Sequence, residues 1–239
     1  MKLLVLQHAV VEHPGIFRDF LLEDEVDWDT VELDEGQSIP AVEAYDMMLV
    51  MGGPQDVWEE QQHPWLKLEK SAIRRFVVDL NRPYLGICLG HQLLAEAIGG
   101  SVAKAKTAEI GVMTVSKTEA GRRDALLQGL SDPLMVLQWH GAEVTDLPLK
   151  TTVLARSEAC AIQAFRYGDR AYGLQCHVET THQTVADWAA LPAYATSFEE
   201  AMGKGTIRRI ATDVADALPQ FNATARLLYK NMRALSAPR

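Results

Sequence analysis

Residues 83–94 read PYLGICLGHQLL, and the organisation of the chain follows from this stretch. A short apolar segment runs directly into a helical pattern, with Cys88 at the junction and a glycine two residues away on either side. A strand that turns into a helix within one residue holds that residue in a strained conformation, which small neighbours permit. The turn pushes the side chain out of the fold, and the positive end of the helix dipole favours negative charge on the sulfur. The stretch therefore predicts a cysteine nucleophile at a strand-to-helix elbow.

The segments before the elbow alternate between strand-like and helix-like patterns. We expect short buried strands at residues 2–7, 30–33 and 44–51, each rich in aliphatic side chains. Between them, residues 15–22 and 63–80 have apolar side chains mostly at three- and four-residue intervals, as amphipathic helices do. This alternation predicts an α/β fold, a parallel sheet with helices on both faces.

The pattern changes after the elbow. Shorter strand-like pieces follow, and a turn at residues 167–169 predicts a hairpin between the last two. The pieces lie at residues 111–116, 134–139, 152–155, 161–165 and 171–175. We therefore expect one domain over residues 1–180 that adds small β strands to the parallel sheet.

A helical pattern occupies residues 181–239, with Pro192 and Pro219 as expected helix boundaries. We expect this segment to form a C-terminal helical extension that packs on the same domain. Its apolar side chains are too numerous to leave in water, since burial of each stabilises by roughly 1.5–3 kcal/mol; they include Trp188, Phe198, Met202 and Ile207. Two roles stay open: the helices cover a sheet face, or residues 188–194 also wall the substrate cleft.

Composition excludes several classes of function. The 239 residues carry a net charge of −9 and no basic run, which argues against nucleic-acid or anionic-membrane partners. The apolar start, residues 1–6, is too short for a signal peptide or a membrane span. The three cysteines form no CxxC pair, so the sequence predicts neither a zinc site nor a disulfide framework. We expect a cytoplasmic protein.

A histidine and a glutamate supply the partners that a cysteine nucleophile needs. In the segment GLQCHVE, residues 173–179, His177 and Glu179 are two positions apart, so both side chains point to the same face of an extended chain. A nucleophile needs a base, and the base needs a group that fixes its tautomer. Cys88, His177 and Glu179 fit these three roles. The alternatives are a polar surface pair and a cysteine buried for packing.

Four motifs together resemble the class I glutamine amidotransferase family. They are GICLGHQ at residues 86–92, MGGP at 51–54, WHG at 139–141 and GLQCHVE at 173–179, and their order and spacing match the family over roughly residues 1–180. The resemblance implies a flavodoxin-like parallel sheet. It also implies that Cys88 attacks the γ-amide of glutamine, giving a γ-glutamyl thioester and then glutamate and ammonia, with no metal or organic cofactor.

The resemblance also implies roles for residues around the cysteine. The backbone N–H groups of Gly53 and Leu89 would form the oxyanion hole. Gln92, His140 and Gly141 would contact the substrate.

The sequence departs from the family pattern at three positions. Cys176 and Val178 flank the histidine where the family usually has Phe or Gly before the His and Pro after it, and Ala142 replaces the usual Asp. None of these changes removes a triad residue. Strand alternation places Cys176 on the face opposite His177, so we expect it in the core. His91 and His140 could each act as an acid or a base, and we expect a packing role for both side chains.

The sequence leaves the biological partner open. It has no GxxxxGK[ST] phosphate loop, so it shows no synthetase half that would consume ammonia. Three interpretations remain: an amidotransferase that works with a separate ammonia-accepting synthetase; a γ-glutamyl peptidase or hydrolase that uses the same triad on γ-glutamyl amines or peptides; and a non-catalytic binding or regulatory relative. Intact Cys88, His177 and Glu179 weigh against the third.

Overall fold

The computed structural model describes residues 1–192, 194, 203 and 206–236. In these residues nine strands form one sheet in the order β2-β1-β3-β4-β9-β8-β7-β5-β6. The strands are β1 Lys2–Gln7, β2 Asp27–Glu32, β3 Met47–Val50, β4 Tyr84–Ile87, β5 Ser101–Lys117, β6 Leu134–Asp146, β7 Thr151–Arg156, β8 Ala164–Tyr167 and β9 Ala171–Leu174.

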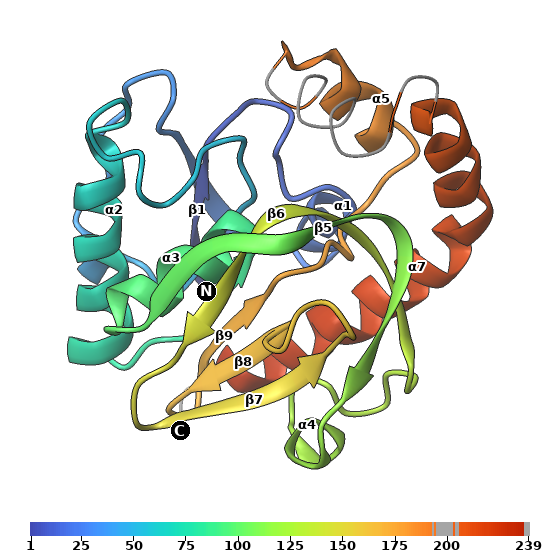
Figure 1. Ribbon diagram of the computed structural model, residues 1–239. Helices are drawn as coiled ribbons and strands as arrows, with labels where there is room; N and C mark the ends of the chain where they lie inside the picture. The colour runs from blue at the N-terminus through green and yellow to red at the C-terminus, as the bar shows by residue number, and fades with distance from the viewer. Residues whose placement is uncertain (193, 195–202, 204–205, 237–239) are drawn as a thin grey trace.

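Helices lie on both faces of this sheet, as the sequence predicts (Figure 1). They are α1 Phe17–Glu23, α2 Trp65–Arg74, α3 Leu89–Ala97, α4 Glu119–Arg123, α5 Thr184–Ala190 and α7 Thr206–Ser236, with a short turn η1 at Val42–Ala44 and a wider turn η2, Arg75–Asp79, that extends α2. Strand β1 shows why two layers are needed. Leu3 and Val5 lie in a core with α1 and α7, whereas Leu4 and Leu6 lie in a second core with α2 and α3.

The sheet combines a parallel half with an antiparallel half. Strands β2, β1, β3, β4 and β9 are parallel neighbours, in the order of the flavodoxin fold. From β9 onward the neighbours β8, β7, β5 and β6 are antiparallel. The expected flavodoxin-like sheet with added β strands is therefore confirmed.

Two of the added strands are much longer than expected. We predicted strands at residues 111–116 and 134–139, but β5 has 17 residues and β6 has 13, and they pair with each other over most of their length. The first seven residues of β5 are exposed or half-buried and lack strict apolar alternation. Pairing with β6 holds this segment in place, and such pairing leaves no signal in the segment's own sequence.

The helical extension continues through a proline that we expected to end a helix. Pro219 lies inside α7 on its exposed side. A proline removes one intrahelical hydrogen bond, and on an exposed face water can bind the freed carbonyl. The expected boundary at Pro219 is therefore wrong.

The extension packs on the sheet domain through a third apolar cluster. Trp188 of α5 and Phe221 of α7 lie in this cluster together with Leu137 and Trp139 of β6. No helix in the described part of the chain is both long enough and apolar enough to span a membrane. Phe198 and Met202 lie outside the described residues, and the division of the chain at residue 180 stays a prediction.

Candidate active site

The elbow has the strained geometry that its sequence predicts. Cys88 follows β4 directly, begins α3, and has φ 52° and ψ −105°. A Cβ on Gly86 would lie 2.3 Å from the Gly90 carbonyl oxygen, and one on Gly90 would lie 2.2 Å from the Val50 oxygen. Only glycines permit this approach of α3 to β4 and β3. Cys88 is only 7% exposed, however. We expected its side chain to project out of the fold, but it does not reach bulk solvent.

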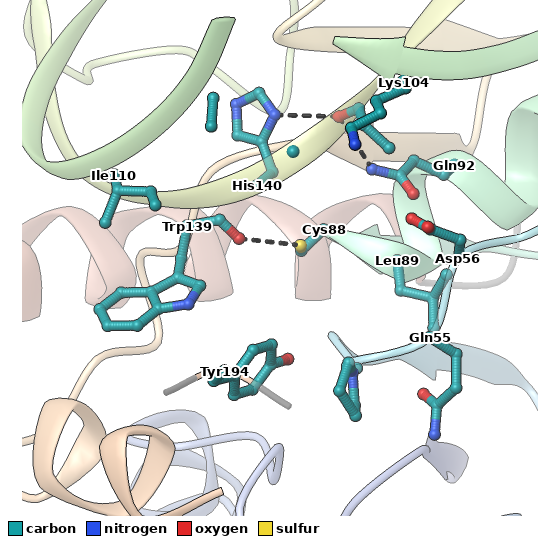
Figure 2. A pocket seen from close by; sticks show the side chains of 15 residues that line it. Gln55, Asp56, Cys88, Leu89, Gln92, Lys104, Ile110, Trp139, His140 and Tyr194 are labelled. Carbon is teal, nitrogen blue, oxygen red and sulfur yellow. Dashed lines mark hydrogen bonds between the residues drawn. The ribbon is translucent and has the colours of Figure 1, made fainter. Parts of the chain in front are cut away.

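Cys88 instead opens into a cleft of about 260 Å³ (Figure 2). Strand β6 crosses above the elbow, and the sulfur lies 3.8 Å from the Trp139 carbonyl oxygen. The cleft brings together the residues that we expected around the cysteine; its lining includes Gly53, Leu89, Gln92, His140 and Gly141.

Two backbone N–H groups beside Cys88 have no acceptor among the described residues. The Cys88 N–H donates to the Leu174 oxygen at 2.8 Å and the Gly90 N–H to the Met51 oxygen at 3.1 Å, but the N–H groups of Gly53 and Leu89 make no such bond. Both of these residues line the cleft. An unpaired donor at a buried site is costly unless a ligand binds it.

His177 is held by its neighbours on two sides. Its Nδ1 lies 2.6 Å from Glu179 Oε1, and the other carboxylate oxygen of Glu179 accepts the Val178 N–H at 2.9 Å. Strand β9 ends at Leu174, earlier than we expected, and His177 forms a single antiparallel bridge with Leu137 of β6. The side chains of His177 and Glu179 therefore meet although the segment is not a continuous strand.

The charge environment of His177 favours its protonated form. Burial alone would lower the pKa of His177, but the Glu179 carboxylate and the Cys88 sulfur beside it raise that pKa well above its usual range. Because both groups act on the pKa of His177, Cys88 and Glu179 both lie close to the imidazole. The arrangement can shuttle a proton to and from a group bound at the sulfur.

A hydrogen-bonded network positions the polar side chains of the cleft. Gln92 Nε2 donates to the Ala142 oxygen at 3.2 Å and to Gln175 Oε1 at 3.1 Å. His140 Nδ1 donates to the same Ala142 oxygen at 2.9 Å, and its Nε2 lies 3.2 Å from Glu109 Oε2. Burial raises the pKa of Glu109, but its contacts with His140 and other neighbours outweigh burial, and the net shift is downward. The Glu109 carboxylate therefore lies close to the His140 ring, while the hydrogen bond of that ring goes from Nδ1 to Ala142.

Several residues of the cleft had no signal in the sequence. Asp56, which follows β3, and Lys104 of β5 line it from opposite sides of Gln92 (Figure 2). Burial and Glu59 raise the pKa of Asp56, while the positive charge of Lys104 opposes this rise. They approach each other only because β5 folds back over the elbow.

The extension also reaches the cleft. Tyr194 lines it and donates its hydroxyl hydrogen to Glu12, which follows β1. The other oxygen of Glu12 has no hydrogen-bonding partner among the described residues. Trp188 does not line the cleft, but its indole lies against the His177 imidazole.

The remaining histidine and cysteines that we considered lie in the core. Cys176 belongs to the apolar core and burial raises the pKa of its thiol, as expected for a packing residue. Burial raises the pKa of Cys160 to about 12. His91 packs on the Phe165 ring, and burial lowers its pKa to about 3.

Comparisons with known proteins show the family of the chain. The family model described as glutamine amidotransferase class-I matches residues 18–187. The chain belongs to the class I glutamine amidotransferase family. Within this family it is 35% identical to the glutamine amidotransferase-like protein YfeJ of Salmonella typhimurium, over 93% of each chain. It is 32% identical to one subunit of the glutamine-hydrolysing GMP synthase of Sulfolobus acidocaldarius, over 73% of this chain and 89% of that protein.

Solved structures of family members have the same fold. A glutamine amidotransferase from Thermotoga maritima superposes with a TM-score of 0.85 at 30% identity, over 97% of each chain. Another, from Methylobacillus flagellatus, superposes with a TM-score of 0.83 at 27% identity, over 100% of this chain and 96% of the other. Because both comparisons extend over nearly the whole chain, the likeness includes the C-terminal extension.

Proposed function

We propose that this protein hydrolyses the γ-amide of glutamine through a γ-glutamyl thioester on Cys88, releasing glutamate and ammonia. One observation carries the proposal: Cys88 interacts with His177 and shares a cleft with Gly53 and Leu89, whose N–H groups have no acceptor in the part of the chain that the structure describes. A nucleophile, a proton carrier and an oxyanion hole are the three parts that acyl transfer requires.

In the first half-reaction the Cys88 thiolate attacks the γ-carbonyl carbon and forms a carbon–sulfur bond. Negative charge moves to the carbonyl oxygen, where the N–H groups of Gly53 and Leu89 stabilise it. Each such donor is worth about 3–4 kcal/mol of barrier lowering. Protonated His177 gives its proton to the amide nitrogen, the carbon–nitrogen bond breaks, and ammonia leaves.

In the second half-reaction the same groups hydrolyse the thioester. The sulfur no longer carries charge, so one of the two groups that raise the His177 pKa is lost. Neutral His177 then accepts a proton from water, and the resulting hydroxide attacks the γ-carbonyl carbon. The carbon–sulfur bond breaks, and glutamate and the Cys88 thiolate are restored. Glu179 keeps the imidazole oriented in both steps.

The charges at the cleft suit an amino-acid substrate. The α-carbon of glutamine carries an ammonium and a carboxylate, and the cleft offers Asp56 and Lys104. We assign Asp56 to the ammonium and Lys104 to the carboxylate, with Gln92, His140 and Gly141 beside them. A volume of about 260 Å³ lies near the lower limit of small-molecule sites, roughly 300 Å³. This size favours glutamine over long γ-glutamyl peptides.

The ammonia acceptor is best sought in a separate synthetase protein. The Sulfolobus acidocaldarius relative is named as one subunit of a glutamine-hydrolysing GMP synthase, and this chain matches 89% of its length. By this likeness we infer that a separate protein receives the ammonia made at Cys88.

Glutamate release by the purified protein tests the proposal. The substrates are glutamine and a panel of γ-glutamyl amines and γ-glutamyl dipeptides, assayed with the wild type and with Cys88→Ala. We expect the highest kcat/KM on glutamine and a loss of at least about a thousandfold in the variant.

Three outcomes would overturn it. A strong preference for γ-glutamyl peptides over glutamine would assign the same chemistry to a peptidase. Glutamine hydrolysis that survives in Cys88→Ala, or no release from any compound with or without a synthetase partner, would remove the catalytic assignment altogether.

A further inference from the structure

His8 is fully buried between the loop that follows β3 and helix α2. Its ring Nδ1 lies 2.8 Å from the Gly52 carbonyl oxygen, and its Nε2 lies 3.0 and 3.2 Å from the two oxygens of Glu69 on α2. The indole of Trp65 stacks on the imidazole with ring centroids 5.4 Å apart. The ring therefore has a fixed plane and a fixed partner at each nitrogen.

The surroundings of the ring favour the imidazolium form. Both ring nitrogens face oxygen acceptors, and only a protonated histidine can donate from both. Burial lowers the pKa of His8, but the attraction of Glu69 and the bond to Gly52 outweigh burial, and the net shift is upward. A charged His8 thus bridges a carboxylate on α2 and a carbonyl of the loop.

That carbonyl belongs to the Gly52–Gly53 peptide, and Gly53 lines the cleft. In a trans peptide the C=O of one residue and the N–H of the next point to opposite sides. When His8 binds the Gly52 oxygen, the Gly53 N–H is directed away from His8. Close packing also fixes the position of Gly53, since a Cβ there would lie 2.7 Å from His8 Cβ and 2.9 Å from the Leu89 side chain.

We propose that the His8–Glu69 pair is a positioning device that locks the Gly52–Gly53 peptide with its N–H aimed at the reacting carbonyl oxygen. This inference rests on the proposed acyl-transfer function and adds to it two residues that do not touch the substrate. His8 would act through the peptide, and Glu69 would act through His8.

The geometry argues for more than a packing role. Two buried charges lose their hydration, and a buried ion pair is often no more stabilising than an apolar pair of similar shape. An apolar pair could join α2 to β1 equally well. It could not hold a carbonyl, however, and one of the two hydrogen bonds of His8 goes to the loop rather than to the helix.

Matched variants separate positioning from packing. His8→Phe keeps a ring that can stack on Trp65 and removes both donors, whereas His8→Asn keeps a donor near the position of Nδ1. His63→Phe is the control, because the His63 ring also contacts the Trp65 ring but makes no hydrogen bond to Gly52, whose oxygen His8 binds. We expect kcat to fall roughly 10- to 100-fold in His8→Phe, with KM nearly unchanged, since losing an oxyanion donor outright costs 100- to 1,000-fold. His8→Asn should recover part of this loss.

A second readout distinguishes the oxyanion hole from the nucleophile. Alkylation of Cys88 by iodoacetamide displaces iodide and develops no oxyanion, so its rate should stay within about twofold of wild type in His8→Phe. Wild-type kcat in His8→Phe, or equal losses of kcat and alkylation rate, would overturn the inference. Should His8→Phe not fold, Glu69→Gln takes its place with the same two readouts and a smaller expected loss of kcat.

Hydrogen exchange tests the inference without relying on catalytic activity. The amides of residues 51–53 should exchange faster in His8→Phe than in wild type, while those of β4 and α3 stay unchanged. Unchanged exchange at residues 51–53 would contradict the proposal that His8 anchors the loop. If the wild type hydrolyses no γ-glutamyl compound, the proposed function fails, and the exchange result still decides whether His8 holds the loop.

Discussion

The indole of Trp188 packs edge-on against the His177 imidazole, with ring centroids 4.6 Å apart and ring planes inclined by 64°. Trp188 belongs to α5, and Tyr194, six residues further on, lines the cleft and bonds to Glu12. The extension thus contacts the site in two ways, behind the proposed base and at the wall of the cleft.

These two contacts predict different effects of substitution. Trp188→Ala should destabilise the protein by about 3–5 kcal/mol, because a large buried side chain is lost, and should lower kcat without changing the ranking of substrates. Tyr194→Ala should cost less stability and change the ranking, since it widens the cleft. Thermal unfolding measures the loss of stability, and kcat/KM for glutamine and γ-glutamyl dipeptides measures the ranking of substrates. An unchanged ranking in Tyr194→Ala would limit the extension to a covering role.

Glu179→Gln should shift the pH dependence of the reaction. The Glu179 charge raises the pKa of His177, so His177 keeps its proton to higher pH and can still protonate the leaving nitrogen. The raised pKa sets the alkaline limit, at which activity is lost as pH rises. Removing the charge lowers that pKa and moves the limit to lower pH, with kcat reduced roughly 100-fold or more. A pH profile of kcat/KM that keeps its alkaline limit would remove Glu179 from this role.

Lys104→Met and Asp56→Asn should weaken substrate binding more than chemistry. A hydrogen bond to a charged group contributes about 1.5–3 kcal/mol, so KM for glutamine should rise roughly 10- to 100-fold while kcat changes little. Lys106→Met is a matched control, because Lys106 lies two positions along β5 and does not line the cleft. Steady-state kinetics measure KM and kcat for each variant. Equal KM values in Lys104→Met and Lys106→Met would show that Lys104 does not bind the α-carboxylate of glutamine.

Gly90→Ala should damage the elbow itself. The added Cβ would lie 2.2 Å from the Val50 oxygen, and α3 would have to move away from β3. Overpacking of this kind costs about 1–3 kcal/mol. Gly141→Ala is the stability control, since a Cβ there would meet nothing within 4 Å. Thermal melting should show a lower Tm for Gly90→Ala alone, and equal melting of both variants would contradict the packing argument.

The parts of the site that the sequence predicts are those with a local signature. The glycines around Cys88 and the two-residue spacing of His177 and Glu179 are visible in a few consecutive letters, because strand and helix geometry fix where neighbouring side chains point. The parallel half of the sheet follows from apolar periodicity in the same way. The backbone donors Gly53 and Leu89 came from the family motif, and the structure places both at the cleft.

The residues that the sequence did not reveal depend on contacts between distant segments. Lys104 reaches the cleft because β5 pairs with β6 and crosses the elbow, and Tyr194 reaches it from the extension. His8 and Glu69 are 61 positions apart and meet only when α2 packs beside β1. A single charged or aromatic residue of this kind has no neighbours in sequence that mark its role.

Chemical trapping of the acyl-enzyme tests the central claim most directly. The wild type is mixed with isotopically labelled glutamine and quenched in acid within milliseconds to seconds, and the peptides that contain Cys88, Cys160 and Cys176 are analysed by mass spectrometry. The account predicts a γ-glutamyl group on Cys88 alone, which hydroxylamine removes as expected for a thioester. Labelled glutamate that forms without any acyl group on Cys88, or an acyl group on another cysteine instead, would contradict it.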